Sequence, residues 1–176
     1  MKVFLLPLFM FLFLVLESVA VELIPQTWWL SNLYYIPHWT LILAALMVVF
    51  YDQEHSYVGL LNGIVFAFII DLAYTNVLGV YLLGYGIALY LIHVLKRFFH
   101  RNMLVMLLFI VIALVSADFI IYGLYLVIGQ ISLDLNDYLL SRLIPTVMIN
   151  ILFLLLIYPI FAKRFSKWKQ EIENMK

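Results

Sequence analysis

The stretch Tyr57–Asn76 reads YVGLLNGIVFAFIIDLAYTN and contains one charged side chain, that of Asp71. A bilayer-spanning helix needs about 20 mostly apolar residues, so this stretch is long enough to cross a membrane. A carboxylate at the bilayer centre costs about 2.5–3.5 kcal/mol on insertion scales, and an acid placed there therefore needs a partner or a purpose. The stretch predicts a membrane helix and raises the question of what Asp71 does inside it.

The composition of the whole chain agrees with this prediction. The 176 residues are 67% hydrophobic and 11% charged, with a mean hydropathy of +1.12, whereas soluble domains are about 45–50% apolar. The chain has no cysteine and four scattered histidines, so neither a disulfide nor a metal site is expected, and no cofactor is implied. Ten basic and ten acidic residues cancel, which leaves no net charge to favour nucleic acid. We expect an integral membrane protein whose surroundings are the lipid bilayer.

Apolar stretches divide the chain into six candidate spans, at about 3–23, 37–51, 57–76, 77–96, 103–129 and 138–162. The second is short, because about 15 residues rise only ~22 Å. The aromatic residues before it would have to form part of the crossing. A five-span count is the alternative. The sequence thus predicts an all-α integral membrane fold, a six-span helix bundle forming one transmembrane domain over residues 1–176, with a basic tail at 163–176.

Basic residues set the orientation of the spans. Nine of the ten fall before span one, between spans four and five, or after span six: Lys2, Lys96, Arg97, Arg101, Lys163, Arg164, Lys167, Lys169 and Lys176. The outer segments 24–36 and 130–137 contain none. Because cytoplasmic loops carry an excess of Lys and Arg, both termini are predicted to lie in the cytoplasm. Trp28, Trp29 and Trp39 then form an aromatic cluster at the outer interface.

The N-terminus also resembles a cleavable signal. Lys2, an apolar stretch and the small residues Ser18 to Ala20 imitate a secretory leader, and cleavage before Val21 would leave five spans. The apolar region is longer than the 7–15 residues usual for such leaders, so we expect it to be retained.

Four charged residues lie within the predicted spans. Glu17, Asp71 and Arg142 fall at a similar depth, roughly 6–9 Å below the outer boundary, and Asp118 lies nearer the middle of span five. One interpretation is an internal salt bridge, in which Arg142 pairs with Asp71 or Asp118 and fixes the last helix to its neighbours. The other is a polar pathway or a pocket for a polar ligand, since buried charges mark such routes in transporters.

Small residues form a stripe on the third span. Gly59, Gly63, Ala67 and Asp71 recur at every fourth position, and Gly59 and Gly63 make a G-x-x-x-G motif that lets another helix approach closely. On the fourth span, Gly79 and Gly86 share a face. These small residues are predicted to be helix-packing positions or an interface for a partner.

Other features of the sequence bear on chemistry and on helix shape. No serine–histidine nucleophile motif, H-E-x-x-H spacing or phosphate-binding glycine loop occurs, so we do not expect an enzyme. Pro145 and Pro159 are predicted to kink the last span or to end it early. Asn62 and Asn150 are candidates for hydrogen bonds between helices, worth about 0.6 kcal/mol each.

The stretch GLLNGIVFAFIIDLAYTNVLGVYLLGYGIALYLIHVLKR, residues 59–97, combines a G-x-x-x-G, an acid, a glycine and a glycine-rich span that ends in basic residues. This pattern resembles the rod shape-determining protein MreD family. The length, the six-span plan, the aromatic outer segment and the short basic tail are similar too, so the resemblance covers essentially the whole chain. Its motif is matched by Gly59, Gly63, Asp71 and Gly79.

The resemblance implies a non-catalytic subunit of the bacterial cell-elongation (Rod) complex in the cytoplasmic membrane. Such a subunit binds MreC and thereby connects MreB filaments, indirectly, with the polymerase RodA and a class B penicillin-binding protein. The resemblance also implies a fold similar to the S-components of energy-coupling-factor transporters, in which Asp71 would belong to a relict pocket. The alternative function is therefore an S-component-like subunit for uptake of a small solute such as a vitamin, with the four buried charges as ligand contacts.

Overall fold

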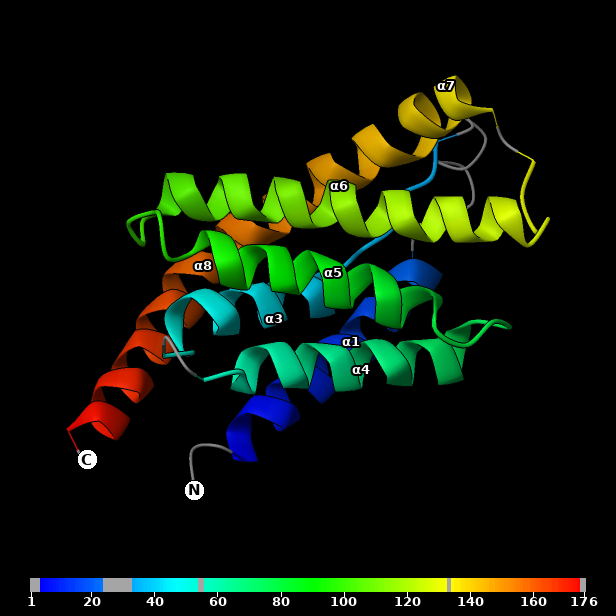
Figure 1. Ribbon diagram of the computed structural model, residues 1–176. Coiled ribbons are helices and arrows are strands. Elements are labelled where there is room, and N and C mark those ends of the chain that lie inside the picture. Colours follow the sequence, from blue (N-terminus) through cyan, green and yellow to red (C-terminus); the bar gives the residue numbers. More distant parts are fainter. Residues whose placement is uncertain (1–3, 24–32, 54–55, 133, 175–176) are drawn as a thin grey trace.

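The computed structural model describes residues 4–23, 33–53, 56–132 and 134–174, and within these ranges the ordered elements are all helices. They are α1 (Leu5–Leu23), α3 (Trp39–Phe50), α4 (Val58–Tyr74), α5 (Val80–Leu95), α6 (Met103–Val127), α7 (Leu135–Tyr138), the π-helical turn η2 (Leu139–Leu143) and α8 (Ile144–Glu173) (Figure 1). The predicted all-α fold is confirmed. The predictions that concern Lys2, Trp28, Trp29 and Lys176 lie outside the described residues.

The helices match the predicted spans in number and order. Within the described ranges, three stretches are long and apolar enough to cross a membrane: α1, α6, and the continuous helix from Leu135 to Glu173. Three shorter apolar helices, α3, α4 and α5, correspond to the second, third and fourth spans. A membrane protein is the class that this pattern indicates.

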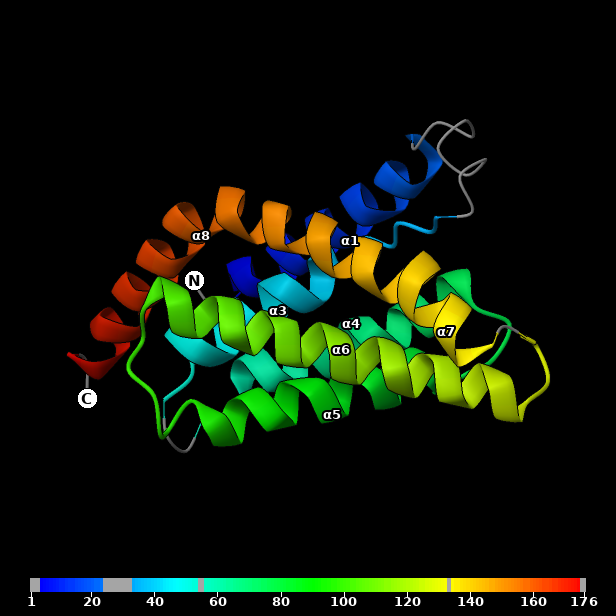
Figure 2. The same ribbon diagram turned by 90° about the horizontal axis from the view of Figure 1, so that it is seen from above.

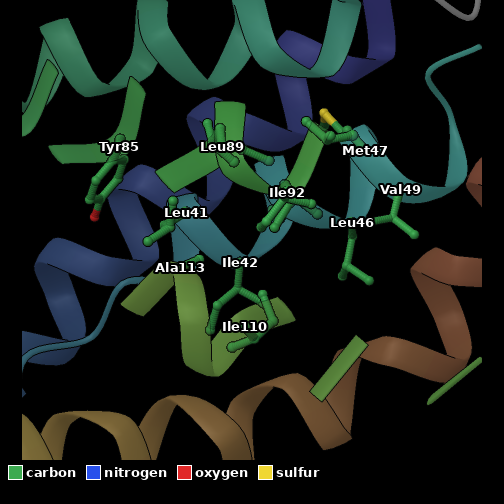
Figure 3. Close-up of a cluster of buried hydrophobic side chains, with 14 of the residues drawn as sticks. Leu41, Ile42, Leu46, Met47, Val49, Tyr85, Leu89, Ile92, Ile110 and Ala113 are labelled. Atoms are coloured by element: carbon green, nitrogen blue, oxygen red, sulfur yellow. The ribbon is translucent and has the colours of Figure 1, made fainter. Parts of the chain in front are cut away.

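The shortest of these helices, α3, lies at the centre of the bundle. It contacts α1, α4, α5, α6 and α8, and all of its residues except Trp39 are buried. Figures 1 and 2 show it enclosed by the longer helices, and Figure 3 shows Leu41, Ile42 and Leu46 packed among side chains of α5 and α6. A helix that is hydrophobic all round is typical of a buried core position, so α3 faces other helices and not lipid.

An extended segment, residues 33–38, leads into α3 and supplies the length that this helix lacks. Its backbone is hydrogen-bonded by side chains of α8. Ile36 N–H donates to Thr146 Oγ1 (3.3 Å), Asn150 Nδ2 donates to the Ile36 carbonyl (2.8 Å), and His38 N–H donates to Asn150 Oδ1 (2.8 Å). Irregular backbone is tolerated at membrane depth only where the protein satisfies its polar groups, and α8 does so here.

Two prolines shape the last helix without ending it. Pro145 has no N–H to donate to the carbonyl of Ser141, four residues earlier, and the backbone N–H of Tyr34 donates to that carbonyl instead, at 2.7 Å. The helix also passes through Pro159 and continues to Glu173, with a change of direction along its length (Figure 2). Of the two effects predicted for the prolines, a kink or an early end, the helix shows a change of direction and continues past both.

The connections separate into two ends of the bundle. In both ribbon views α1 begins, α3 joins α4, α5 joins α6 and α8 finishes at one end, which we call the basic end. The turns from α4 to α5 and from α6 to α7 lie at the opposite end (Figures 1 and 2). The described basic residues of the basic end are Lys96, Arg97, Arg101, Lys163, Arg164, Lys167 and Lys169. The last four lie on α8 itself, so most of the predicted tail is a continuation of that helix.

Candidate functional site

The glycine stripe of α4 packs against α3. A Cβ atom added to Gly59 would lie 2.8 Å from the backbone nitrogen of Val48, and one added to Gly63 would overlap the side chain of Leu89. Both glycines are buried, as is Ala67 one turn further on. They are helix-packing positions within the same chain: Gly59 faces α3, and Gly63 faces Leu89 of α5 and Ala44 of α3. This corrects the alternative in which a partner's helix occupies this groove.

Asp71 binds the first turn of α5. Its Oδ2 accepts hydrogen bonds from the backbone N–H groups of Gly79 (3.0 Å) and Leu82 (3.0 Å), and its Oδ1 accepts one from Tyr81 (2.9 Å). The first N–H groups of a helix have no acceptor within the helix and carry the positive end of its dipole. The buried charge of Asp71 is therefore compensated by a helix N-terminus, and Arg142 is not its partner.

Gly79 and Gly86, predicted to share a packing face, have different environments. Gly79 is the N-cap of α5, with φ of +98°, a left-handed conformation that favours glycine, and a Cβ added there would meet no atom within 4 Å. A Cβ added to Gly86 would meet only Ile64, at 4.0 Å. The tight glycine of α5 is Gly84, whose added Cβ would lie 3.1 Å from the Ala117 carbonyl oxygen of α6. Neither predicted residue is a close packing position.

Two more carboxylates, the half-buried Glu17 and the buried Asp52, also bind helix N-termini. Glu17 Oε2 accepts hydrogen bonds from Thr40 N–H (2.8 Å) and from Thr40 Oγ1 (2.6 Å), at the first turn of α3. Asp52 Oδ1 accepts one from Gly59 N–H (2.8 Å), at the first turn of α4. Together with Asp71, these acids hold the starting points of three successive helices.

Asp118, which is buried, and Arg142, which is partly exposed, form an ion pair inside the bundle. Arg142 approaches Asp118 Oδ1 through Nη2 (3.0 Å) and Nε (3.3 Å), and Tyr138 donates its hydroxyl hydrogen to Asp118 Oδ2 (2.8 Å). Asp118 is on α6 and Arg142 is on the π-helical turn, so the pair joins these two elements. Of the two acids predicted as partners of Arg142, the structure brings Asp118 to it.

His38, which the sequence analysis did not single out, lies at the edge of this pair. Its Nδ1 is hydrogen-bonded to the Tyr85 hydroxyl (2.8 Å), its Nε2 lies 3.9 Å from Asp118 Oδ1, and its side chain is fully buried. The available signal was a polar residue directly after Pro37, at the start of an otherwise apolar span. Asn150, predicted as a contact between helices, holds the backbone on both sides of Pro37.

The basic end has its own polar cluster, also missed from the sequence. Lys96 Nζ donates to the carbonyls of Val48 (2.8 Å) and Asp52 (3.3 Å), and so closes the C-terminus of α3. Burial raises the pKa of the Asp52 carboxyl to about 6, while the hydrogen bond from Gly59 N–H and the nearby Lys96 ammonium act in the opposite direction. The connection from α3 to α4 is thus held by one acid and one base.

The contacts described above join helix ends to neighbouring elements. Among the described residues no group of three or more His, Cys, Asp or Glu side chains could hold a metal ion. A cavity of about 280 Å³ opens between α1 and α4, with Glu17, Ser18, Tyr74 and Tyr81 among its lining residues. The arrangement holds helix ends together and leaves this mostly apolar cavity beside Glu17, at the end away from the basic residues.

Comparisons with known proteins agree with one another. The family model of the rod shape-determining protein MreD matches residues 2–168. The chain is similar to the Rod shape-determining protein MreD of Bacillus subtilis (strain 168), with 29% identity over 174 residues that cover 99% of each chain. No solved structure matches the chain.

Proposed function

The chain belongs to the rod shape-determining protein MreD family, and from this membership we propose that it is a non-catalytic membrane subunit of the cell-elongation (Rod) complex. Its role in determining rod shape follows from the family. In the proposed mechanism it binds the membrane protein MreC, and through MreC it connects MreB filaments with RodA and the class B penicillin-binding protein. Its contribution is association and positioning.

The observation that carries the non-catalytic proposal is how the buried charges are used. Glu17, Asp52 and Asp71 each bind a helix N-terminus, and Asp118 binds Arg142. A general acid or base needs a proton-exchanging group that can reach a substrate. Asp52, Asp71 and Asp118 are fully buried and hydrogen-bonded to parts of the fold, and Glu17, which lines a cavity, is hydrogen-bonded to Thr40. Their arrangement supports a rigid body that other proteins bind.

The proposed orientation places the basic end in the bacterial cytoplasm. α1 begins and α8 finishes at this end, and the turn from α5 to α6 at the same end contains Arg97 and Arg101. Positively charged segments next to membrane helices stay in the cytoplasm. Six crossings with both termini inside fit this distribution.

The face of α6 that looks away from the bundle is the proposed docking surface for the membrane helix of MreC. It carries a hollow of about 550 Å³ lined by Val111, Ile112, Val115, Ser116, Phe119 and Ile120. The lining is apolar apart from the small Ser116, and packing of small and apolar side chains is what joins helices in lipid. The glycines of α4 are excluded from this role because α3 already covers them.

Co-purification with MreC tests the proposal directly. Val115→Trp fills the hollow and should reduce the recovered MreC at least tenfold. Leu104→Trp, on the same helix and outside the hollow, is the matched control, because Leu104 is 75% exposed and meets lipid. Equal recovery with both variants would remove this face from the interface, and failure of the wild type to recover MreC would contradict the scaffold function itself.

A cellular test separates the scaffold from the alternative of solute uptake. Depletion of the protein in a rod-shaped bacterium should give round, swelling cells. The uptake alternative is favoured by the cavity beside Glu17, which is large enough for a small molecule and opens away from the basic end. Normal rods that require an added nutrient would support uptake and contradict the scaffold.

A further inference from the structure

A groove of about 490 Å³ lies at the basic end, between the last residue of α3 and the part of α8 that follows Leu156. Its lining residues are Phe50, Tyr158, Pro159, Ala162, Lys163, Ser166, Lys167 and Gln170. The inner part is apolar, and the rings of Phe50 and Tyr158 meet edge to face there at 5.8 Å. We propose that this groove binds the phosphate headgroup of an anionic phospholipid of the inner leaflet.

The groove lies at the depth of the phosphate groups of the inner leaflet. Residues 143–162 contain no charged side chain, so twenty residues of helix separate Arg142 from Lys163. At 1.5 Å per residue they rise about 30 Å, and because Arg142 already lies below the outer boundary, this length carries Lys163 past the inner side of the ~30 Å hydrocarbon layer. Lys163 is therefore the first charge at the level where phosphate groups lie.

Two basic side chains of α8 are available to bind a phosphate group, whereas two others have contacts within the chain. Arg164 lies over the rings of Phe9 and Trp168, at 5.5 and 5.7 Å, and so faces α1. Lys169 approaches Glu173 at 3.7 Å. Lys163 and Lys167 are both exposed, and neither has an ion-pair partner in the part of the chain that the structure describes.

The side chains that line the groove are complementary to an anionic headgroup. Lys163 and Lys167 are four residues apart on a continuous helix, so their side chains project from the same face. Ser166 and Gln170 add hydrogen-bond donors, and none of the lining residues is acidic. Basic pockets beside membrane helices on the cytoplasmic side are suited to anionic headgroups. The apolar inner part of the groove suits the start of an acyl chain.

The inference rests on the proposed orientation and not on MreC binding. It is tested on the full chain in nanodiscs of phosphatidylethanolamine with a minor fraction of phosphatidylglycerol. Native mass spectrometry after release into detergent counts the phosphatidylglycerol that stays bound. The paired substitution Lys163→Gln and Lys167→Gln should reduce retention about 25-fold, since each lysine near an anionic surface contributes a factor of about five.

Two further variants make the test specific. Arg97→Gln with Arg101→Gln removes the same charge from the same end but outside the groove, and it should retain the lipid. Ser166→Leu fills the groove, keeps both lysines and should lose the lipid. All five substituted residues are exposed or half-buried, and an unchanged melting temperature checks that the variants fold.

Each contrary result overturns the proposal in a different way. Equal losses from the two paired variants would mean diffuse attraction to the membrane. Displacement of the lipid by millimolar glycerol phosphate would reassign the groove to a soluble phosphate compound. Unchanged lipid retention with loss of a co-purifying acidic protein would reassign it to a protein partner. A wild type that retains no phosphatidylglycerol would contradict the site, and MreC recovery from the same preparation would show whether the scaffold function also fails.

Discussion

Asp71 accepts a hydrogen bond from the backbone N–H of Gly79, at 3.0 Å, across the turn that joins α4 to α5. Asp71 and Gly79, two of the four residues that match the family motif, are therefore in direct contact. Gly79 adopts a positive φ, and in that conformation its N–H and those of two residues in the first turn of α5 all reach the same carboxylate. Of the other two motif residues, Gly59 packs the same helix α4 against α3, and Gly63 packs it against α3 and α5.

Removal of this carboxylate is expected to destabilise the bundle. Asp71→Ala leaves three N–H groups without an acceptor, at a cost on the order of 3 kcal/mol, and Gly79→Ala forces an alanine into the left-handed region at about 1–2 kcal/mol. Thermal unfolding in detergent measures both effects. Gly129→Ala at the end of α6, also at a positive φ but with no bond to a buried acid, shows the cost of backbone strain alone. Unchanged melting of Asp71→Ala would refute this assignment.

Arg142 should be coupled to Asp118 and not to Asp71. Arg142→Ala strands the Asp118 charge and is expected to cost about 3–5 kcal/mol, by analogy with buried pairs in soluble proteins. Adding Asp118→Asn should recover part of the loss, because the amide oxygen still accepts from Tyr138. Adding Asp71→Asn should only add its own cost. Double-mutant cycles, read out as melting temperature and accumulated protein, show whether Asp118 or Asp71 is coupled to Arg142. Rescue by Asp71→Asn would identify Asp71 as the partner.

The glycine stripe is expected to be a requirement of folding. Gly59→Leu would place a side chain against the backbone of α3, where an added Cβ already lies 2.8–2.9 Å from Val48 and Met47. We expect loss of monodisperse protein in size-exclusion chromatography. Gly123→Leu is the control, since an added Cβ there meets nothing within 4 Å. A well-folded Gly59→Leu protein that fails only to bind MreC would restore the partner-interface interpretation.

Stability should fall as the pH rises through the titration of Asp52. Burial raises the pKa of this carboxyl from 3.8 to about 6, so the folded protein binds the proton more tightly than the unfolded chain does. The contribution is complete below about pH 4 and is lost as the pH passes 6, by up to about 3 kcal/mol. Asp52→Asn keeps an acceptor for Gly59 N–H and should flatten the melting temperature between pH 4 and pH 7. Asp134→Asn, at the opposite end, should leave that dependence in place.

Sequence reasoning succeeded where a feature depends on neighbouring residues. Hydropathy and spacing located the apolar helices, and the four-residue period of Gly59 and Gly63 predicted a close helix contact. It could not choose the partner of Arg142, because Asp71 and Asp118 are both acids at membrane depth. The choice depends on where the N-terminus of α5 lies relative to Asp71. That is a three-dimensional relationship set by the turn at Gly79.

The same limit explains the missed residues. His38 and Thr40 matter because they meet elements that are distant along the chain. Asp52 and Lys96 looked like ordinary loop charges, since nothing local reveals that they cover the end of one helix and the beginning of another. Partners of this kind are specified by packing, which a single sequence does not display.

The contact between the extended segment and α8 has a consequence for the order of synthesis. Asn150 completes the hydrogen bonds of His38, 112 residues earlier, and Thr146 completes those of Ile36. During synthesis, residues 33–38 and α3 leave the ribosome long before α8 does. Until then the polar backbone of residues 33–38 has no partner from α8, and unpaired groups of this kind are costly in lipid. A chain truncated before α8 would therefore keep these backbone groups unpaired and should be degraded by membrane proteases. The bundle can complete its folding only after α8 has been synthesised.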